Sequence, residues 1–417
     1  MSVDDLFGHT YMVRRWRQAP LYGKRVAFLK HLLQLGYARG TVKVMAYSLL
    51  TVIPFFPLEP KRQIRRSEIV EVAARWARRR VRAGRASSTI ASRAQFIRVA
   101  QQWFTFLGRL EKQRNPSAPF ATELADFQRW MLEERGLAPA SIETFTRQVL
   151  AFLRWLKRRR QTLRGLSARD VDAYFSSEQC RRLSRKSLVL IASALRCFFR
   201  HAQCRGWCSA DIAAGIDRPV VYRHAGLPQG PTWPQVWKLI ASTTGNKPTD
   251  LRSRAIFLLL ATYGLRMGEI IKLTLDDLDW DRELIRVRRG KGRRLALYPM
   301  TPEVGVALSR YVSRARPVNF GREVFLTLVA PVRPLCRSAF GRITARRFKR
   351  LDIRPPRGGP HSLRHACATH LVQQGASFKA IADQLGHRSL MTTGIYAKVD
   401  LKALRQVADF DLKGVVA

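Results

Sequence analysis

The sequence has 417 residues and a hydrophobic content of 46%, so it is long enough for two or three domains with packed cores and is not a disordered polycation. Its 75 Lys and Arg residues outnumber 30 Asp and Glu residues, which gives a formal net charge of +45. Basic residues recur along the whole chain, which indicates a polyanionic partner, with nucleic acid as the first candidate and a membrane surface as the alternative.

Two features argue against the membrane alternative. The longest apolar run, around Ala255 to Ala261, is far below the ~18 residues typical of a spanning helix. The N-terminus carries Asp4 and Asp5 and lacks the apolar core of a signal peptide. We therefore expect a cytoplasmic, nucleoid-associated protein with no membrane partner.

The six cysteines are too few for a disulfide framework in a chain of this length. Cys197, His201, Cys204 and Cys208 resemble a metal site, but their spacing places them along one helical stripe about 16 Å long at ~1.5 Å per residue. One zinc ion cannot reach all four unless the helix breaks at Gly206. The pattern favours buried cysteines in helix packing, and we expect neither metal nor cofactor.

The N-terminal quarter is predicted to be helical after a loose arm over residues 1–20. Apolar residues recur at helical spacing throughout residues 21–112, which predicts an extra helical domain. The predicted helices are Arg25–Leu33 ending at Gly36, Thr41–Phe56, Glu68–Arg80 capped by Ser67, and a last one between Ser88 and Gly108.

Residues 118–212 predict a second helical domain that repeats this plan. Its first helix, Leu124–Glu134, ends at a glycine, and Ser167 with Asp170 predicts a capping box at a later helix start. An internal duplication is one interpretation, and chance alignment of two helical bundles is the other. The matched positions are Gly36 with Gly136, Thr41 with Ser141, Phe55 with Trp155, Thr89 with Ser187, Ile97 with Leu195, and Gly108 with Gly206.

Glycine and proline are dense in residues 213–231, which predicts a linker, and Thr232 with Gln235 predicts the capping box that opens the last domain, 232–417. Two alternating runs around glycines in residues 284–298 predict a β-hairpin with Lys291 at its tip. The other predicted elements are the helices Trp237–Ser242, Arg254–Thr262, Pro302–Val312, one starting at His361, Phe378–Leu385, Thr392–Val399 and Leu401–Val407.

A cluster of polar residues near the C-terminus suits chemistry on a phosphate. His361 and Arg364 share one helix face, and Pro360 before them predicts a helix start, where backbone N–H groups favour an anion. His387 and Tyr396 follow within a few dozen residues. An arginine fork, imidazoles and a phenol together are typical of a phosphate attacked by a tyrosine.

Five short motifs in this order resemble the tyrosine recombinase (phage integrase) family, firmly over 233–410 and more loosely over 118–212. The resemblance implies a mainly α fold, with helical (SAM-like) core-binding domains and an α-rich catalytic domain that holds a small antiparallel β-sheet. The matching stretches are Tyr263–Ile270, Gly290–Gly292, His361–His365, Leu385–Ser389 and Thr392–Tyr396.

The resemblance implies a role for each polar residue. Tyr396 matches the nucleophile that forms a 3′-phosphotyrosyl intermediate, and Arg266 and Arg364 match the pair that clamps the phosphate oxygens. Lys291 matches the general acid for the leaving 5′-oxygen.

Three further residues complete the implied site. His361 is expected to assist proton transfer at the tyrosine, and His387 to donate to a phosphate oxygen. Glu269 is expected to orient the cluster from behind. The alternative for His361 and His365, a pair of zinc ligands, lacks a glutamate between them and a third ligand.

The resemblance implies a metal- and ATP-independent enzyme that recombines double-stranded DNA at inverted-repeat core sites, as a homo-tetramer or a mixed recombinase assembly. The N-terminal addition favours integration, excision or transposition of a mobile element. Two alternatives are an inactive DNA-binding or architectural relative and a type IB topoisomerase-like enzyme. Residues 21–112 are expected to contact DNA or protein, and five arginines would face phosphates in the first case: Arg78, Arg79, Arg80, Arg82 and Arg85.

Overall fold

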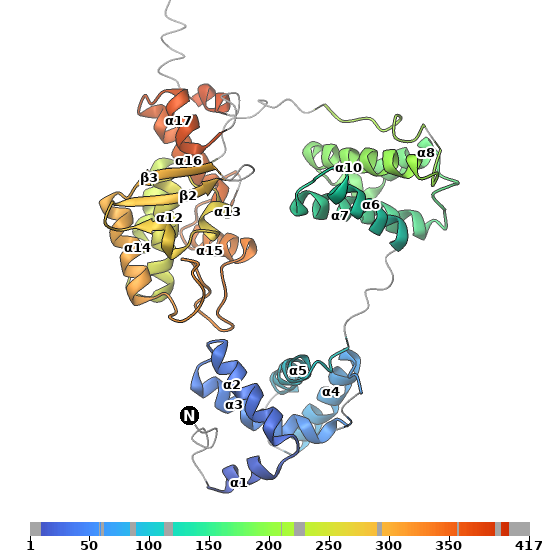
Figure 1. The fold of residues 1–417 in the computed structure, drawn as a ribbon, viewed down its shortest axis with the longest axis vertical. Helices are drawn as coiled ribbons and strands as arrows, with labels where there is room; N and C mark the ends of the chain where they lie inside the picture. The colour runs from blue at the N-terminus through green and yellow to red at the C-terminus, as the bar shows by residue number, and fades with distance from the viewer. Residues whose placement is uncertain are drawn as a thin grey trace, which may run out of the picture. The chain divides into compact units, whose positions relative to one another are not determined.

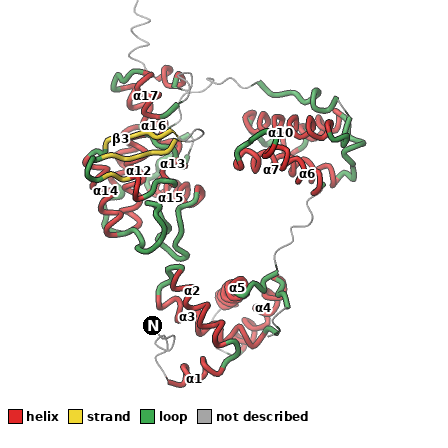
Figure 2. The backbone as a smooth tube through the Cα atoms, in the orientation of Figure 1, coloured by secondary structure: helices red, strands yellow, loops and turns green. Residues whose placement is uncertain are grey.

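The structure is a computed structural model, and it describes residues 10–57, 59, 62–83, 89–111, 120–209, 211–220, 230–289, 294–356, 358–387 and 393–399. The chain divides into two compact units, one formed by residues 112–225 and the other by residues 1–111 together with 226–417. Helices dominate, and the strands of the described residues lie in the C-terminal domain (Figures 1 and 2). The mainly α fold with a small antiparallel sheet is therefore confirmed.

The N-terminal bundle (Figure 1) consists of α1 (Thr10–Gln18), α2 (Tyr22–Gln34), α3 (Arg39–Val52), the 3-10 turn η2 (Ile53–Phe55), α4 (Arg66–Arg82) and α5 (Thr89–Phe106). The prediction of a loose arm is wrong for residues 10–18, because Trp16 of α1 is fully buried. Arg25 fixes this helix: its Nη2 donates to the carbonyl of Trp16 at 2.6 Å, and its guanidinium lies 4.2 Å from the Trp16 ring. The predicted cap Ser67 is also wrong, since α4 begins after Arg65.

The second bundle consists of α6 (Ala121–Glu133), α7 (Pro139–Arg158), α8 (Ala168–Phe175), α9 (Glu178–Arg181) and α10 (Arg185–Cys204). The predicted capping box is confirmed, since the backbone N–H of Ser167 donates to the Asp170 carboxylate at 3.0 Å. The helix predicted to open at Ser141 opens at Pro139 instead. Ala213 and Ile216 are buried in this bundle, so the linker begins after the predicted position 213.

The two bundles share local details that a duplication predicts. Each starts its first long helix, α2 or α6, after a residue with left-handed backbone, Leu21 or Phe120. Glycines with positive φ follow α2, α5, α6 and α10 at the matched positions Gly36, Gly108, Gly136 and Gly206. Duplication of the bundle stays a prediction with this local support.

The C-terminal domain is built around α12 (Pro248–Tyr263), whose side chains are buried around almost its whole circumference. Such a helix needs apolar neighbours on every side. The elements that the site uses are α13 (Met267–Ile271), α15 (Arg337–Arg350), α16 (Pro360–Gln373), α17 (Phe378–Leu385) and the 3-10 helix η5 (Gly394–Val399). The remaining elements are α11 (Trp233–Ala241), the turn η3 (Leu275–Asp277) and α14 (Pro302–Arg314), and α15 was not predicted from the sequence.

The sheet has the order β1 (Leu278–Asp279), β2 (Leu284–Arg289), β3 (Arg294–Pro299), and all its pairs are antiparallel. The predicted hairpin is confirmed by the pairing of Ile285 with Tyr298 and of Arg289 with Arg294. Its tip, residues 290–293 with Lys291, lies outside the described residues. The predicted capping box of Thr232 with Gln235 is confirmed at the start of α11.

The cysteine-rich stripe of α10 pairs its histidine with a carboxylate. His201 is buried, and its Nε2 lies 2.9 Å from Oδ2 of Asp126 on α6. Cys204 is exposed and Cys197 and Cys208 are half-buried, so the prediction of buried cysteines is wrong for Cys204. In the described part of the chain, every helix is too short or too polar to cross a membrane.

Candidate active site

Arg266 lies at the turn between α12 and α13, and Glu269 holds it in place. The backbone N–H of Arg266 donates to Oε2 of Glu269 at 2.8 Å, and its Nη1 donates to Oε1 at 2.9 Å. The Glu269 side chain is nearly inaccessible, whereas the Arg266 side chain is 39% exposed. A buried carboxylate thus holds a partly exposed guanidinium in place by two hydrogen bonds.

Arg364 lies deeper, on the second turn of α16, and is only 3% exposed. Its Nη1 donates to the carbonyl of Gly264 at 2.6 Å, and its Nη2 donates to the carbonyl of Leu385 at 2.6 Å. Burial, and next the charge of Arg266, lower its pKa to about 10. The guanidinium is therefore still charged at neutral pH, in a place where charge acts over a low dielectric.

A third arginine, Arg289, joins this cluster at the end of β2, and the sequence reasoning missed it. Its Nη2 donates to the carbonyl of Gln384 at 2.5 Å, and its guanidinium lies 5.3 Å from the ring centroid of Tyr298. Two of its other nitrogens, Nε and Nη1, are buried without a hydrogen-bond partner in the described residues. The alternation of β2 offered a signal, because Arg289 shares the face of the buried Ile285 and Val287.

The three arginines meet the last carbonyls of α17. Arg289 donates to Gln384, Arg364 donates to Leu385, and Arg266 Nη2 donates to Gly386 at 2.9 Å. These carbonyls have no partner within the helix and carry the negative end of its dipole, so they suit cations. The end of α17 therefore holds arginines from three separate elements side by side.

Tyr396 is 2% exposed on η5, and α16 lies against this short helix. Its Oη lies 2.8 Å from Nδ1 of His365, one residue after Arg364. Burial raises the pKa of Tyr396 to about 12, although the charge of Arg364 acts in the opposite direction. The phenol is thus protonated at neutral pH and has an imidazole nitrogen in contact with its oxygen.

His387 follows the end of α17, and its Nδ1 lies 2.7 Å from the hydroxyl of the fully buried Thr393. Burial, and then the charges of Arg364, Arg266 and Arg289, lower the pKa of His387 to about 4. His387 is therefore a neutral imidazole at physiological pH. If the Thr393 hydroxyl donates to Nδ1, the proton of the ring is on Nε2.

His361 lies on the first turn of α16 and is exposed. Its ring centroid is 4.9 Å from that of His365, with the two planes at 79°. The structure thus brings Arg266, Glu269, Arg364, His387 and Tyr396 together around α17, and His361 lies beside the histidine that contacts the tyrosine. Lys291 is outside the described residues.

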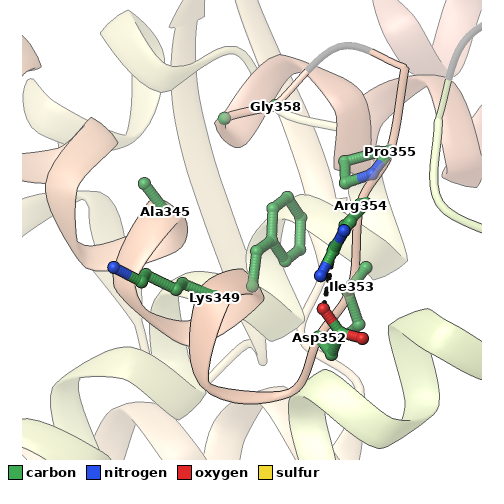
Figure 3. A pocket seen from close by; sticks show the side chains of 9 residues that line it. Ala345, Lys349, Asp352, Ile353, Arg354, Pro355 and Gly358 are labelled. Carbon is green, nitrogen blue, oxygen red and sulfur yellow. Dashed lines mark hydrogen bonds and ion pairs between the residues drawn. The ribbon is translucent and has the colours of Figure 1, made fainter.

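A pocket of about 630 Å³ lies between α15 and the loop that precedes α16 (Figure 3). Its wall includes Phe348 and Lys349 of α15 and also Asp352, whose carboxylate accepts a 2.8 Å hydrogen bond from Nε of Arg354. The residues that line it include none of the predicted catalytic side chains. The arginine cluster and the tyrosine are therefore separate from this pocket.

The second bundle presents a smaller, basic hollow of about 290 Å³. Trp130 and Phe145 lie among four arginines there, Arg135, Arg196, Arg200 and Arg218. The guanidinium of Arg135 lies 5.4 Å from the Trp130 ring. Arginines around aromatic faces suit a phosphate backbone.

Two family models match this chain. The phage integrase family matches residues 233–402, and the N-terminal SAM-like domain of phage integrases matches residues 124–206. The protein y4rF of Sinorhizobium fredii, named as an integrase/recombinase, is 31% identical over 97% of this chain and 95% of its own length. The tyrosine recombinase XerD of Xanthomonas axonopodis is 31% identical over 66% of this chain and 92% of its own length.

This chain is a member of the phage integrase family. It is accordingly a tyrosine recombinase, an enzyme for site-specific recombination, and residues 124–206 form its SAM-like domain. The crystal structure of the site-specific recombinase XerH bound to its difH substrate is similar in fold, with a TM-score of 0.52 and 17% identity over 85% of this chain and 99% of that chain. The transposon Tn1549 integrase in complex with DNA gives a TM-score of 0.50 and 21% identity over 67% of this chain and 99% of that one.

Proposed function

We propose that this tyrosine recombinase breaks and rejoins DNA strands through a covalent 3′-phosphotyrosyl intermediate on Tyr396. The observation that carries the proposal is a buried phenol next to an imidazole and under the charge of Arg364. The phenolic oxygen attacks the scissile phosphorus, and the 5′-oxygen leaves. The new ester conserves the energy of the phosphodiester, so the strand rejoins without ATP.

Arg266 and Arg364 clamp the non-bridging oxygens of that phosphate. Their backbone bonds to the end of α17 use only some of the five N–H groups of each guanidinium, which leaves donors for the phosphate. The same bonds hold the forks rigid before DNA binds. A clamp that is already in position costs little reorganisation when charge grows in the transition state.

Three other residues act at the oxygens of the reacting phosphate and of the tyrosine, two by proton transfer and one by a hydrogen bond. Lys291 protonates the leaving 5′-oxygen, and an ammonium can give up a proton where a guanidinium cannot. His387, neutral because its pKa is lowered to about 4, donates through Nε2 to a phosphate oxygen without adding charge. His361 assists proton movement at the tyrosine from the exposed end of α16.

The DNA partner is a duplex with inverted-repeat core sites, on which four subunits, identical or mixed with a related recombinase, assemble in the nucleoid. The net charge of +45 and the arginine-lined hollow of the second bundle support binding to the phosphate backbone. Relatedness to y4rF along nearly the full chain supports a role in moving an element, by integration, excision or transposition.

The N-terminal bundle is proposed to be a second DNA-gripping module, a duplicate of the core-binding domain. Arg78, Arg79, Arg80 and Arg82 are exposed along the last turns of α4. The positive charges of exposed arginines so close together repel one another unless an anion neutralises them. Phosphates outside the core site supply that anion.

A covalent-trapping experiment tests the proposed chemistry. Duplexes from the DNA that flanks the coding region are footprinted, and the protected site is rebuilt with a nick next to the cleavage position. We expect the wild type to be trapped on this duplex through Tyr396, and Tyr396→Phe to bind equally well without any covalent product. A cross-linked peptide that maps elsewhere, or cleavage by the Phe variant, would refute the assignment. Recombination between two such sites on one plasmid then distinguishes excision from integration.

A further inference from the structure

His365 is the histidine whose ring nitrogen meets the nucleophilic oxygen, and the proposed function leaves it without a role. Its Nδ1 lies 2.8 Å from Tyr396 Oη, a normal hydrogen-bond length. The two ring centroids are 5.9 Å apart with planes at 52°, so the rings meet through their polar atoms and are not stacked. The contact joins α16 to η5, thirty-one residues later.

We propose that His365 is the general base of strand cleavage. As Tyr396 Oη forms its bond to phosphorus, the phenolic proton passes to Nδ1 of His365, and the 5′-oxygen leaves with a proton from Lys291. In rejoining, the 5′-hydroxyl gives its proton back to the neutral amine of Lys291 as its oxygen bonds to phosphorus, the phosphotyrosyl bond breaks, and the imidazolium returns its proton to the phenol oxygen. Both directions balance in atoms and charge, and the inference rests on the proposed role of Tyr396 as nucleophile.

The surroundings of the tyrosine explain why a base is needed there. Tyr396 is 2% exposed, so bulk water has little access to its hydroxyl, and burial raises its pKa to about 12. Arg364 assists the phenolate electrostatically, but a guanidinium cannot accept a proton. Cys367, the other titratable group that acts on this phenol, is itself buried with its pKa raised to about 12.

The position of His365 on α16 suits the task. It is half-buried, and its ring contacts both the ring of the exposed His361 and the hydroxyl of the buried Tyr396. The preceding residue, Arg364, donates hydrogen bonds to two backbone carbonyls, and these bonds restrain the turn of α16 that carries His365. A base that is already in hydrogen-bond contact needs no rearrangement before transfer.

The test compares variants in single-turnover cleavage of the nicked duplex, at protein concentrations that saturate the DNA. His365→Gln keeps a polar side chain but accepts a proton poorly, so we expect cleavage to slow by about 10²–10⁴-fold at unchanged DNA affinity. His370→Gln is the matched control, because His370 is on the same helix but stacks on Trp233 at 3.7 Å. We expect it to cleave at close to the wild-type rate.

A second measurement separates a base from a packing residue. A trifluorotyrosine at position 396 ionises more readily, so it depends less on a base, and it should reduce the defect of His365→Gln. Added imidazole should also restore cleavage to His365→Ala, whose truncation leaves a space at a half-buried position. Both rescues are expected; a defect of the same size with either tyrosine, together with no rescue by imidazole, would overturn the base assignment.

The outcomes distinguish this inference from the proposed function. If the wild type is trapped through Tyr396 and His365→Gln is trapped equally fast, His365 is not the base although Tyr396 is the nucleophile. If neither protein is trapped on the DNA, the proposed role of Tyr396 as the nucleophile is wrong, and the base assignment that rests on it is wrong as well. Circular-dichroism melting of each variant shows whether a slow variant is folded.

Discussion

The substitution Gly264→Ala is expected to damage the site through the backbone. Gly264 ends α12 with φ +58°, in the left-handed region that costs other residues about 1–2 kcal/mol. A Cβ there would lie 2.4 Å from Cδ2 of Leu385 and 3.3 Å from Sγ of Cys367, and overpacking of this kind costs about 1–3 kcal/mol. The combined loss of stability for the C-terminal domain is about 2–5 kcal/mol.

The same substitution affects catalysis because Gly264 and Leu385 supply the two carbonyls that hold Arg364. A methyl group that pushes Leu385 away separates these acceptors and loosens the guanidinium. A loss of 1.4 kcal/mol from the transition state corresponds to about a tenfold slower reaction. We expect single-turnover cleavage to fall by more than about tenfold even at temperatures where the variant is folded.

The assay is thermal unfolding of the full chain, followed by cleavage at a temperature below the transition. For a domain of this size each kcal/mol shifts the melting temperature by about 2–4 °C, so the fall should be at least about 4 °C. Gly341→Ala on α15 is the control, because a Cβ there meets no atom within 4 Å and the helix gains about 0.4–1 kcal/mol. A Gly264→Ala protein that melts and cleaves like the wild type would refute the reasoning.

Four further predictions concern the charges. Lys291→Ala should slow cleavage strongly. A substrate with sulfur in place of the leaving 5′-oxygen should restore much of the rate, because a sulfur leaving group needs little protonation. An equal defect on both substrates would mean that Lys291 acts in DNA binding and not as the acid. Arg364→Lys keeps the charge but loses the fork, so we expect a severe defect in single-turnover cleavage, and a near-normal rate would reduce Arg364 to bulk charge. The pKa of His387 is lowered from 6.5 to about 4, so the folded state binds this proton less readily than the unfolded state does. The stability of the fold should therefore decrease as the pH drops from 6.5 towards 4. His387→Gln should flatten this part of the curve of melting temperature against pH. Removal of residues 1–115 should shorten the nuclease footprint on DNA. It should also reduce the slope of log affinity against log salt by about 0.9 for each phosphate that the N-terminal bundle neutralises. If the footprint is unchanged but the truncated protein no longer pairs two sites, the N-terminal bundle binds protein instead of DNA.

The elements that the sequence predicted well are those whose signal is local. The bounds predicted for α17, Phe378–Leu385, agree with the structure to the residue. Alternation around Gly290 predicted the hairpin of β2 and β3. The prediction of a loose arm was wrong because no pattern in the neighbouring sequence shows that Trp16 is buried. From the sequence alone, its partner Arg25 is expected to be a solvent-exposed charge, and only the folded chain shows the contact between the two.

The candidate site likewise combines features that have a local signal in the sequence with features that have none. The motif residues could be proposed from the sequence because their side chains carry the chemistry that the resemblance implies. The structure adds the groups that hold these side chains, and many of those groups are backbone carbonyls. The carbonyls of Gln384, Leu385 and Gly386 have no side-chain signature, so no pattern in the sequence shows that the end of α17 gathers arginines from three elements.

This dependence on backbone carbonyls also has a consequence for Gly386. It follows α17 with φ +62°, and a Cβ there would lie 1.4 Å from Nη1 of Arg289. The glycine therefore serves the arginine cluster twice, by adopting the left-handed backbone that ends α17 and by leaving room for the guanidinium of Arg289. The cluster needs this glycine as much as it needs its arginines, because only a residue without a side chain lets a third cation approach the same helix end.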